Sequence, residues 1–165
     1  MRNLVPYSGD TFTLYEEAVK RMANGESKLL LTDSKRLIKD YYNAYDIQFE
    51  QNSLHTLPAN TVNGKLYKEL YNLYGNGKSV VRKIYSHLKG VNPTTVIGIC
   101  QHCGINTDDT MDHILPRSAY AEYSINAKNL IPCCSDCNRR KNTADRKSAS
   151  GLHTDYCGYL FPFPF

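Results

Sequence analysis

Residues 131–141 read IPCCSDCNRRK: three cysteines in five positions, then an asparagine and three cations. A second cysteine cluster, CQHC, lies at residues 100–103. Each cluster contains the C-x2-C spacing that lets two thiolates converge on one tetrahedral zinc ion. Two such pairs in one chain predict a structural zinc site with four ligands. These ligands would be Cys100, Cys103, Cys134 and Cys137.

The two pairs are separated by thirty residues, more than the roughly 15–20 of a usual zinc ribbon. We therefore expect the ion to fasten the ends of a small domain rather than to react. Two further cysteines, Cys133 and Cys157, are best interpreted as small buried apolar side chains. The alternative is a second metal site that combines Cys133 and Cys157 with His153.

The composition limits the class of protein. Of 165 residues, 41% are hydrophobic and 22% charged, as in ordinary soluble globular domains. The net charge of +4 permits a polyanionic partner without requiring one. No apolar run approaches the ~20 residues of a membrane span, and the first residues lack the apolar stretch of a secretory signal. We therefore expect a cytoplasmic protein with no membrane contact, where cysteines hold metal rather than form disulfides.

Residues 1–90 are expected to be mostly helical. Apolar residues recur at helical spacing in four segments, at 12–25, 32–52, 64–75 and 78–90. Gly25 is expected to end the first helix, and Thr32 or Asp33 to cap the second. The buried stripe predicted for the second helix is Leu37, Tyr41, Tyr45 and Phe49, with Ile38 and Tyr42 alongside.

The character of the chain changes near residue 90. The stretch VNPTTVIG at residues 91–98 predicts a short strand, because proline interrupts a helix and β-branched residues follow. The predicted fold class is therefore α+β, with a helical region at residues 1–90 and a second domain at residues 91–165. The helical region would dock a partner or position nucleic acid.

Chemically versatile residues lie between and just after the cysteine pairs. Asp112 and His113 form an acid–imidazole pair, and Asn129 and Asn138 follow. An Asp-His pair alone is common, and on a regular strand its side chains point to opposite faces. More specific is the order C-x2-C, Asp-His-Ile-x-Pro, Asn-Leu and C-x2-C-Asn, with Lys141 one helical step later.

That order, over about residues 97–145, resembles the HNH nuclease superfamily. Its members have a ββα-metal core that is often fastened by a four-cysteine zinc. The longer string at residues 112–138 is similar to bacterial HNH proteins often found in anti-phage gene clusters. Residues 1–90 resemble no family that we can name.

The resemblance implies a role for each residue of the motif. His113 would be the general base, and its ordinary pKa of about 6.5 suits that task near neutral pH. Asp112 and Asn138 would bind a catalytic Mg²⁺ or Mn²⁺ ion, which prefers oxygen ligands. Asn129 would hold the His113 loop by hydrogen bonds.

The cations near the motif are candidates for phosphate contact. Arg139, Arg140 and Lys141 would lie on a helix that starts near Ser135. A solvated helix face is the alternative, and it is the commoner meaning of a charge run. Beside a phosphodiester site, however, phosphate contact is at least as well supported. Arg117 is a second candidate, and none of these contacts would read base sequence.

The predicted activity is therefore hydrolysis of DNA phosphodiester bonds with one metal ion. One alternative is a zinc-stapled nucleic-acid-binding module without catalysis. Another is a nuclease subunit of a multi-protein anti-phage complex, whose helical half binds a partner such as an ATPase. The apolar end DYCGYLFPFPF would pack on the core, insert into a partner or continue into further chain.

Overall fold

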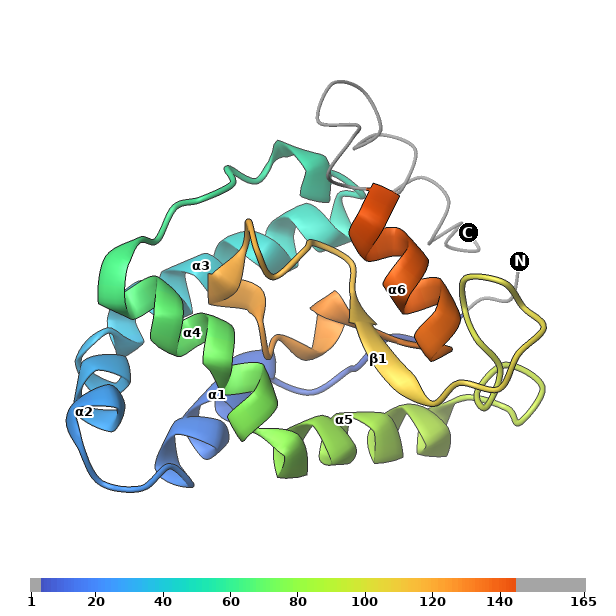
Figure 1. Ribbon diagram of the computed structural model, residues 1–165, viewed down its shortest axis with the longest axis horizontal. Coiled ribbons are helices and arrows are strands. Elements are labelled where there is room, and N and C mark those ends of the chain that lie inside the picture. The colour runs from blue at the N-terminus through green and yellow to red at the C-terminus, as the bar shows by residue number, and fades with distance from the viewer. Residues whose placement is uncertain (1–3, 145–165) are drawn as a thin grey trace.

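The computed structural model describes residues 4–144, with side chains through residue 141, and Figure 1 shows its elements. The helices are α1 (Thr11–Lys20), α2 (Glu26–Asp33), α3 (Lys35–Glu50), α4 (Gly64–Asn76), α5 (Lys78–Val91) and α6 (Ser135–Ala144). The strands are β1 (Thr110–His113) and β2 (Leu130–Cys133), and the short 3-10 turns are η1 (Leu54–Thr56), η2 (Ala121–Tyr123) and η3 (Ala127–Asn129). The predicted α+β class with a helical first half is confirmed. Cys157, His153 and the apolar C-terminal stretch lie outside the described residues.

Two helix boundaries differ from the prediction. The first helix ends at Lys20, and Gly25 precedes α2 as its N-cap. The cause is Lys28, whose ammonium donates to the carbonyl oxygens of Lys20 and Met22 at 3.0 and 3.1 Å and so satisfies the end of α1. Thr32 and Asp33 are not caps, because they belong to α2.

The buried face of α3 keeps Tyr45 and Phe49 of the predicted stripe. In its first half, Ile38 and Tyr42 are buried in place of Leu37 and Tyr41. Leu37 is 44% exposed, whereas Ile38 is completely buried. The inner face consists of Ile38, Tyr42, Tyr45 and Phe49. This 4-3-4 spacing follows the helical period of 3.6 residues better than uniform steps of four.

The stretch at residues 91–98 is not a strand. The peptide N–H groups of Val96 and Ile97 both donate to the carbonyl oxygen of Pro93, at 2.8 and 3.1 Å, which folds the stretch into a turn. Ile99, just beyond it, forms an isolated antiparallel bridge with Thr107. Local hydrogen bonding after the proline therefore overrides the β propensity of the sequence.

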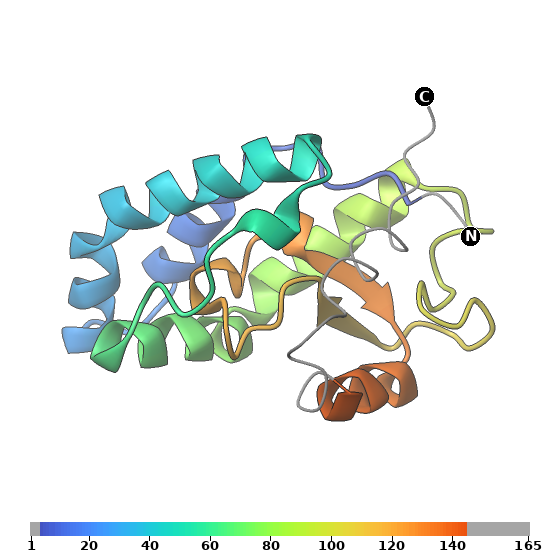
Figure 2. The same ribbon diagram turned by 90° about the horizontal axis from the view of Figure 1, so that it is seen from above.

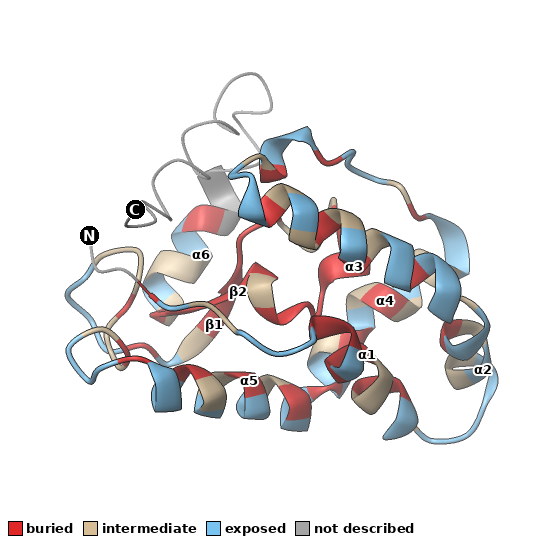
Figure 3. Cartoon of the chain, turned by 180° about the vertical axis from the view of Figure 1, so that it is seen from behind, coloured by how far each residue is buried: buried red, intermediate tan, exposed pale blue. Residues whose placement is uncertain are grey.

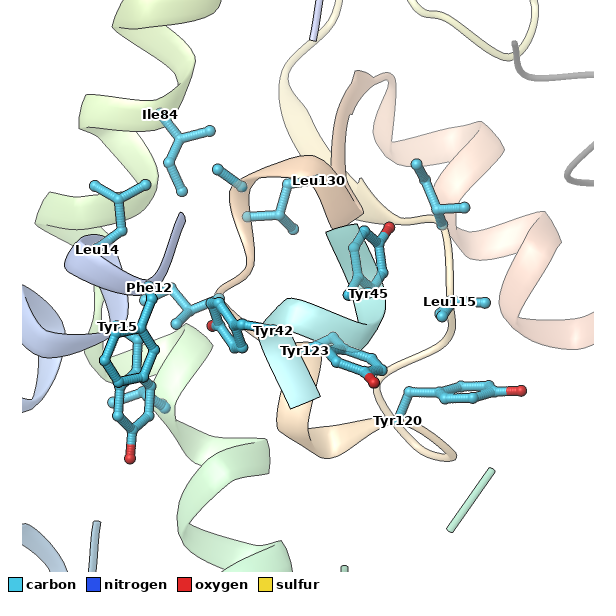
Figure 4. Close-up of a cluster of buried hydrophobic side chains, with 14 of the residues drawn as sticks. Phe12, Leu14, Tyr15, Tyr42, Tyr45, Ile84, Leu115, Tyr120, Tyr123 and Leu130 are labelled. Carbon is cyan, nitrogen blue, oxygen red and sulfur yellow. The ribbon is translucent and has the colours of Figure 1, made fainter. Parts of the chain in front are cut away.

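One hydrophobic core joins residues on both sides of position 90. At its centre, the rings of Tyr45 from α3 and Tyr123 from η2 have centroids 4.9 Å apart, and Figure 4 shows them side by side. Figure 3 shows the buried side of the helices turned toward the strands. The division at residue 90 stays a prediction, but packing makes the two parts interdependent.

The two strands form an antiparallel sheet in which Thr110 lies opposite Cys133 and His113 opposite Leu130. Since directly paired residues share a face and neighbours alternate, Asp112 and Cys133 lie on one face and His113 on the other. Figure 2 shows α6 on one side of the strands and the helices of the first half on the other. We call these sides the α6 face and the helical-body face.

The order β1, β2, α6 is the strand–strand–helix arrangement expected from the motif. Within residues 4–144, no helix combines the length and the apolar character needed to cross a membrane.

Candidate active site

The four cysteines predicted as zinc ligands come together. Their sulfur atoms all lie within 4.8 Å of one another. The first pair is shaped by Gly104, whose φ of 66° suits glycine and whose N–H donates to the carbonyl oxygen of Cys100 at 2.9 Å. The N–H groups of Asn106 and Ile105 lower the pKa of Cys103 to about 6, which favours the thiolate form that binds metal. This donor set fits a metal ion such as zinc.

On the α6 face, Asp112 is the centre of a buried polar network. Its side chain is 7% exposed, and its Oδ2 atom lies 2.8 Å from Nε2 of His102 and 2.8 Å from Nζ of Lys141. Burial alone would raise the pKa of Asp112, but the hydrogen bond from His102 and the charge of Lys141 lower it below the usual value. The carboxylate is therefore ionised, as a metal ligand must be.

On the helical-body face, His113 is held as a neutral imidazole. Its Nε2 atom lies 2.9 Å from the carbonyl oxygen of Ser124. A carbonyl only accepts, so Nε2 carries the hydrogen and Nδ1 carries the lone pair. Burial lowers the pKa of His113 to about 4. The residue thus has the protonation state of a general base at neutral pH.

Asn129 fixes the segment that follows His113. Its Oδ1 accepts from the N–H of Leu115 at 2.7 Å, and its Nδ2 donates to the Leu115 carbonyl oxygen at 3.2 Å. Tyr45 from α3 also donates to Oδ1, at 3.3 Å. These contacts give Asn129 a structural position behind the strand.

Helix α4 forms a wall beside His113 that sequence reasoning did not find. The ring of Tyr74 lies 4.7 Å from the imidazole of His113, measured between centroids, and its hydroxyl donates to the carbonyl oxygen of Met111 at 3.2 Å. The Ser124 hydroxyl donates to the Leu70 carbonyl oxygen at 2.5 Å, which anchors the acceptor of His113 to the same helix. The tyrosines were interpreted only as core residues, because their helical spacing carries no sign of which element packs on them.

The predicted phosphate-binding cations occupy different environments. The Arg117 guanidinium lies 4.0 Å from the ring centre of Tyr71 and 5.3 Å from that of Tyr74, which places it on the α4 wall. Arg139 and Arg140 are exposed, and Arg139 pairs with Asp136. Lys141 is buried, and its ammonium donates to Asp112 and to the carbonyl oxygen of His113. It therefore points into the site rather than outward with the two arginines.

The two faces meet at the free edge of β1. Asn138 from α6 donates through Nδ2 to the Met111 carbonyl oxygen at 3.5 Å, and Tyr74 from α4 donates to the same oxygen. Asp112 and Asn138 thus border one side of this edge, and His113 and Tyr74 border the other. The regular strand keeps Asp112 and His113 side chains apart, as the alternation rule predicts.

Comparison with known proteins gives this geometry a family. Residues 100–144 match the family described as HNH endonuclease. This segment is an HNH domain. It includes both cysteine pairs, the Asp-His pair and both asparagines, whereas the α4 wall lies outside it.

One curated relative extends the comparison. The Septu protein PtuB of Bacillus thuringiensis is 32% identical over 77 residues. The match covers 44% of this chain and 29% of the relative, so the chain spans less than a third of that protein. No solved structure matches the chain.

Proposed function

We propose that this protein is a metal-dependent endonuclease that hydrolyses phosphodiester bonds of DNA, with His113 as general base. The observation that carries the proposal is the state of His113 inside an HNH domain. Its imidazole is neutral, Nε2 is committed to the Ser124 carbonyl oxygen, and Nδ1 is left as the basic atom.

Two metal ions belong to the proposal, in different roles. Zinc on the four cysteines would fasten the ends of the HNH domain. Mg²⁺ or Mn²⁺ would be held by Asp112 and Asn138, whose oxygens suit hard cations. When bound, that ion would stabilise the charge on the phosphate and on the leaving 3′ oxygen.

The chain's own residues would carry the proton. Nδ1 of His113 takes a proton from a water molecule while the water oxygen bonds to phosphorus and the bond to the 3′ oxygen breaks. The leaving 3′ oxygen takes a proton from solvent water, so the products would be a 5′-phosphate and a 3′-hydroxyl. Arg117, which stacks on the Tyr71 ring of α4, would hold the phosphate, and the exposed Arg139 and Arg140 would contact the backbone.

Plasmid cleavage tests the proposal. Supercoiled DNA incubated with the protein and Mg²⁺ or Mn²⁺ should be nicked or linearised, and EDTA should stop the reaction. His113→Ala should lower the rate by about 10²–10⁴-fold. The matched control is His55→Ala, at an exposed histidine of η1. A folded His113→Ala protein that cleaves like the wild type would overturn the mechanism, and DNA binding without cleavage would favour the non-catalytic module.

A second proposal is that this nuclease works as one subunit of a multi-protein anti-phage complex. Similarity to the Septu protein PtuB supports it, together with the resemblance of residues 112–138 to HNH proteins of anti-phage gene clusters. The helical half would then bind a partner such as an ATPase. Cleavage that requires a co-purified partner would favour this proposal, whereas full activity of the isolated chain would argue against it.

A further inference from the structure

A second set of metal-binding side chains lies beside the four-cysteine cluster. A ring nitrogen of His102, a carboxylate oxygen of Asp112 and Sγ of Cys133 all lie within 4.8 Å of one another. They come from three separate segments: the first cysteine loop, β1 and the end of β2. The strand register explains the meeting, because Cys133 is paired with Thr110 and shares a face with Asp112.

The cysteine cluster orients two of these three groups. His102 lies between Cys100 and Cys103, and Cys133 directly precedes Cys134. A zinc ion on the four cysteines would therefore fix the backbone on both sides of the second set. The function proposed above uses neither His102 nor Cys133. From the sequence, Cys133 was interpreted as a small buried apolar side chain.

The distances are close to those of a bound ion. Nitrogen, oxygen and sulfur ligands of a tetrahedral zinc-like ion stand roughly 3.2–3.8 Å apart, given bonds of about 2.0–2.3 Å. His102 and Asp112 are 2.8 Å apart and would separate slightly. The widest separation in the set is at most 4.8 Å and would close by about 1 Å, which side-chain rotation supplies.

We propose that His102, Asp112 and Cys133 form a transition-metal site on the α6 face. The proposal rests on the proposed function in taking Asp112 as a metal ligand, and it narrows the ion. Imidazole and thiolate suit Zn²⁺ or Co²⁺ better than Mg²⁺ or Mn²⁺, which prefer oxygen ligands. The nuclease ion is then a transition metal with two protein ligands that the HNH motif does not supply.

Lys141 sets the affinity of this site. Its ammonium lies 2.8 Å from Oδ2 of Asp112, the same oxygen that His102 contacts. A divalent ion and an ammonium repel each other at this distance, so binding of the ion displaces Lys141 from the carboxylate. Replacing the ammonium by an apolar group of similar length should therefore tighten metal binding.

Cobalt binding tests the site without relying on cleavage. Protein that carries one zinc per chain is titrated with Co²⁺, and both the zinc retained and the thiolate-to-cobalt absorption are recorded. The wild type should bind one further ion with a thiolate band. Cys133→Ala should lose the band and bind about 10- to 100-fold more weakly, His102→Ala should weaken binding similarly, and Lys141→Met should strengthen it. The control, His55→Ala, should match the wild type.

The outcomes separate this site from the nuclease proposal. If zinc-loaded wild type binds no second Co²⁺ ion, or if Cys133→Ala keeps the same band and affinity, the site is overturned. Mg²⁺-dependent plasmid cleavage would then leave the nuclease standing. Conversely, a second Co²⁺ ion that depends on Cys133 and His102 supports the site even if no protein cleaves DNA, in which case the nuclease proposal fails alone.

Discussion

Asp112 and His113 are neighbours on β1, but the two faces of the strand give them opposite surroundings, one charged and one apolar. On the α6 face, Asp112 lies in a charged network with His102 and Lys141. On the helical-body face, His113 contacts a backbone carbonyl and the ring of Tyr74. The first environment lowers the pKa of the acid despite its burial, and the second lowers the pKa of the imidazole to about 4 by burial.

This contrast shows how one strand supplies an ionised acid and a neutral imidazole, the two forms that the proposed hydrolysis needs. A metal ligand must be ionised and a general base must be neutral, and two adjacent residues reach those states because a pleated strand gives them different surroundings. The α6 face is built from residues 100–141, whereas the helical-body face depends on α4, a helix from the first half of the chain. Each face can therefore be disrupted separately.

The largest effect, on the free energy of unfolding, is expected when the cysteine cluster beside the α6 face loses a ligand. Cys137→Ser should release the bound zinc and lower the free energy of unfolding of the HNH domain by several kcal/mol, because metal binding contributes directly to folding. Elemental analysis and urea unfolding measure both. Cys133→Ala is the comparison for the zinc site alone: it leaves the four predicted zinc ligands in place and should keep that zinc, although it should weaken binding of the second ion proposed above. A zinc-free Cys137→Ser protein with the wild-type unfolding midpoint would contradict a structural role for the zinc ion.

A smaller effect, on the cleavage rate, is expected when the ring beside His113 on the helical-body face is removed. Tyr74→Leu removes the ring beside His113 and should slow cleavage by about 10- to 100-fold through loss of positioning. It should also let the pKa of His113 rise toward its ordinary value, so the rate should fall at a higher pH than in the wild type as the solution is acidified. The pH profile of cleavage measures this shift.

The control for Tyr74→Leu is a second tyrosine on α4. Tyr67 donates to the Ser118 carbonyl oxygen at 3.1 Å and is exposed enough to be replaced. Tyr67→Leu should leave the pH profile unchanged. If Tyr74→Leu also leaves it unchanged, Tyr74 does not position the base.

The smallest effect, on the pH dependence of stability, is expected from a buried acid in η2. Glu122 in η2 accepts from the Thr61 hydroxyl at 2.7 Å through Oε1, and Oε2 has no partner among the described residues. Burial raises the pKa of Glu122 above 4.5. The unfolded chain therefore releases this proton at lower pH than the folded chain, so stability is lost as the pH rises from 4.5 through the raised pKa.

Replacing this acid should remove that loss. Glu122→Gln should raise the melting temperature by a few degrees at pH 7–8, about what 1 kcal/mol produces, and leave it nearly unchanged at pH 4. Thermal unfolding at the two pH values measures the difference. An equal shift at both would show that the carboxyl charge is not the cause.

The motif residues could be predicted from the sequence because their spacing is local. The C-x2-C pairs identified the cysteine cluster, and the ordered asparagines identified the segment now matched to HNH endonucleases. His102 and Tyr74 could not be found in this way. Their partners are 10 and 39 positions away, and helical or loop spacing does not show which distant element packs on a side chain.

The same limit explains the errors in the first half. Periodicity identified the helix of residues 35–50, but the direction of its buried face depended on Tyr123, far along the chain. At residues 91–98, β propensity competed with hydrogen bonds to Pro93, and the local turn prevailed.

The wall that α4 places beside His113 has a consequence for the order in which the protein is made. Chains fold progressively from the N-terminus as they are synthesised. Helix α4, which lies beside His113, has emerged before β1 exists, while Ser124 and Asn138 arrive about 11 and 25 residues after His113. The proposed general base therefore has its α4 neighbour from the start, whereas Asn138, one of the two proposed ligands of the catalytic ion, arrives late. If the proposed nuclease function holds, a nascent chain therefore cannot cleave DNA until α6 has left the ribosome.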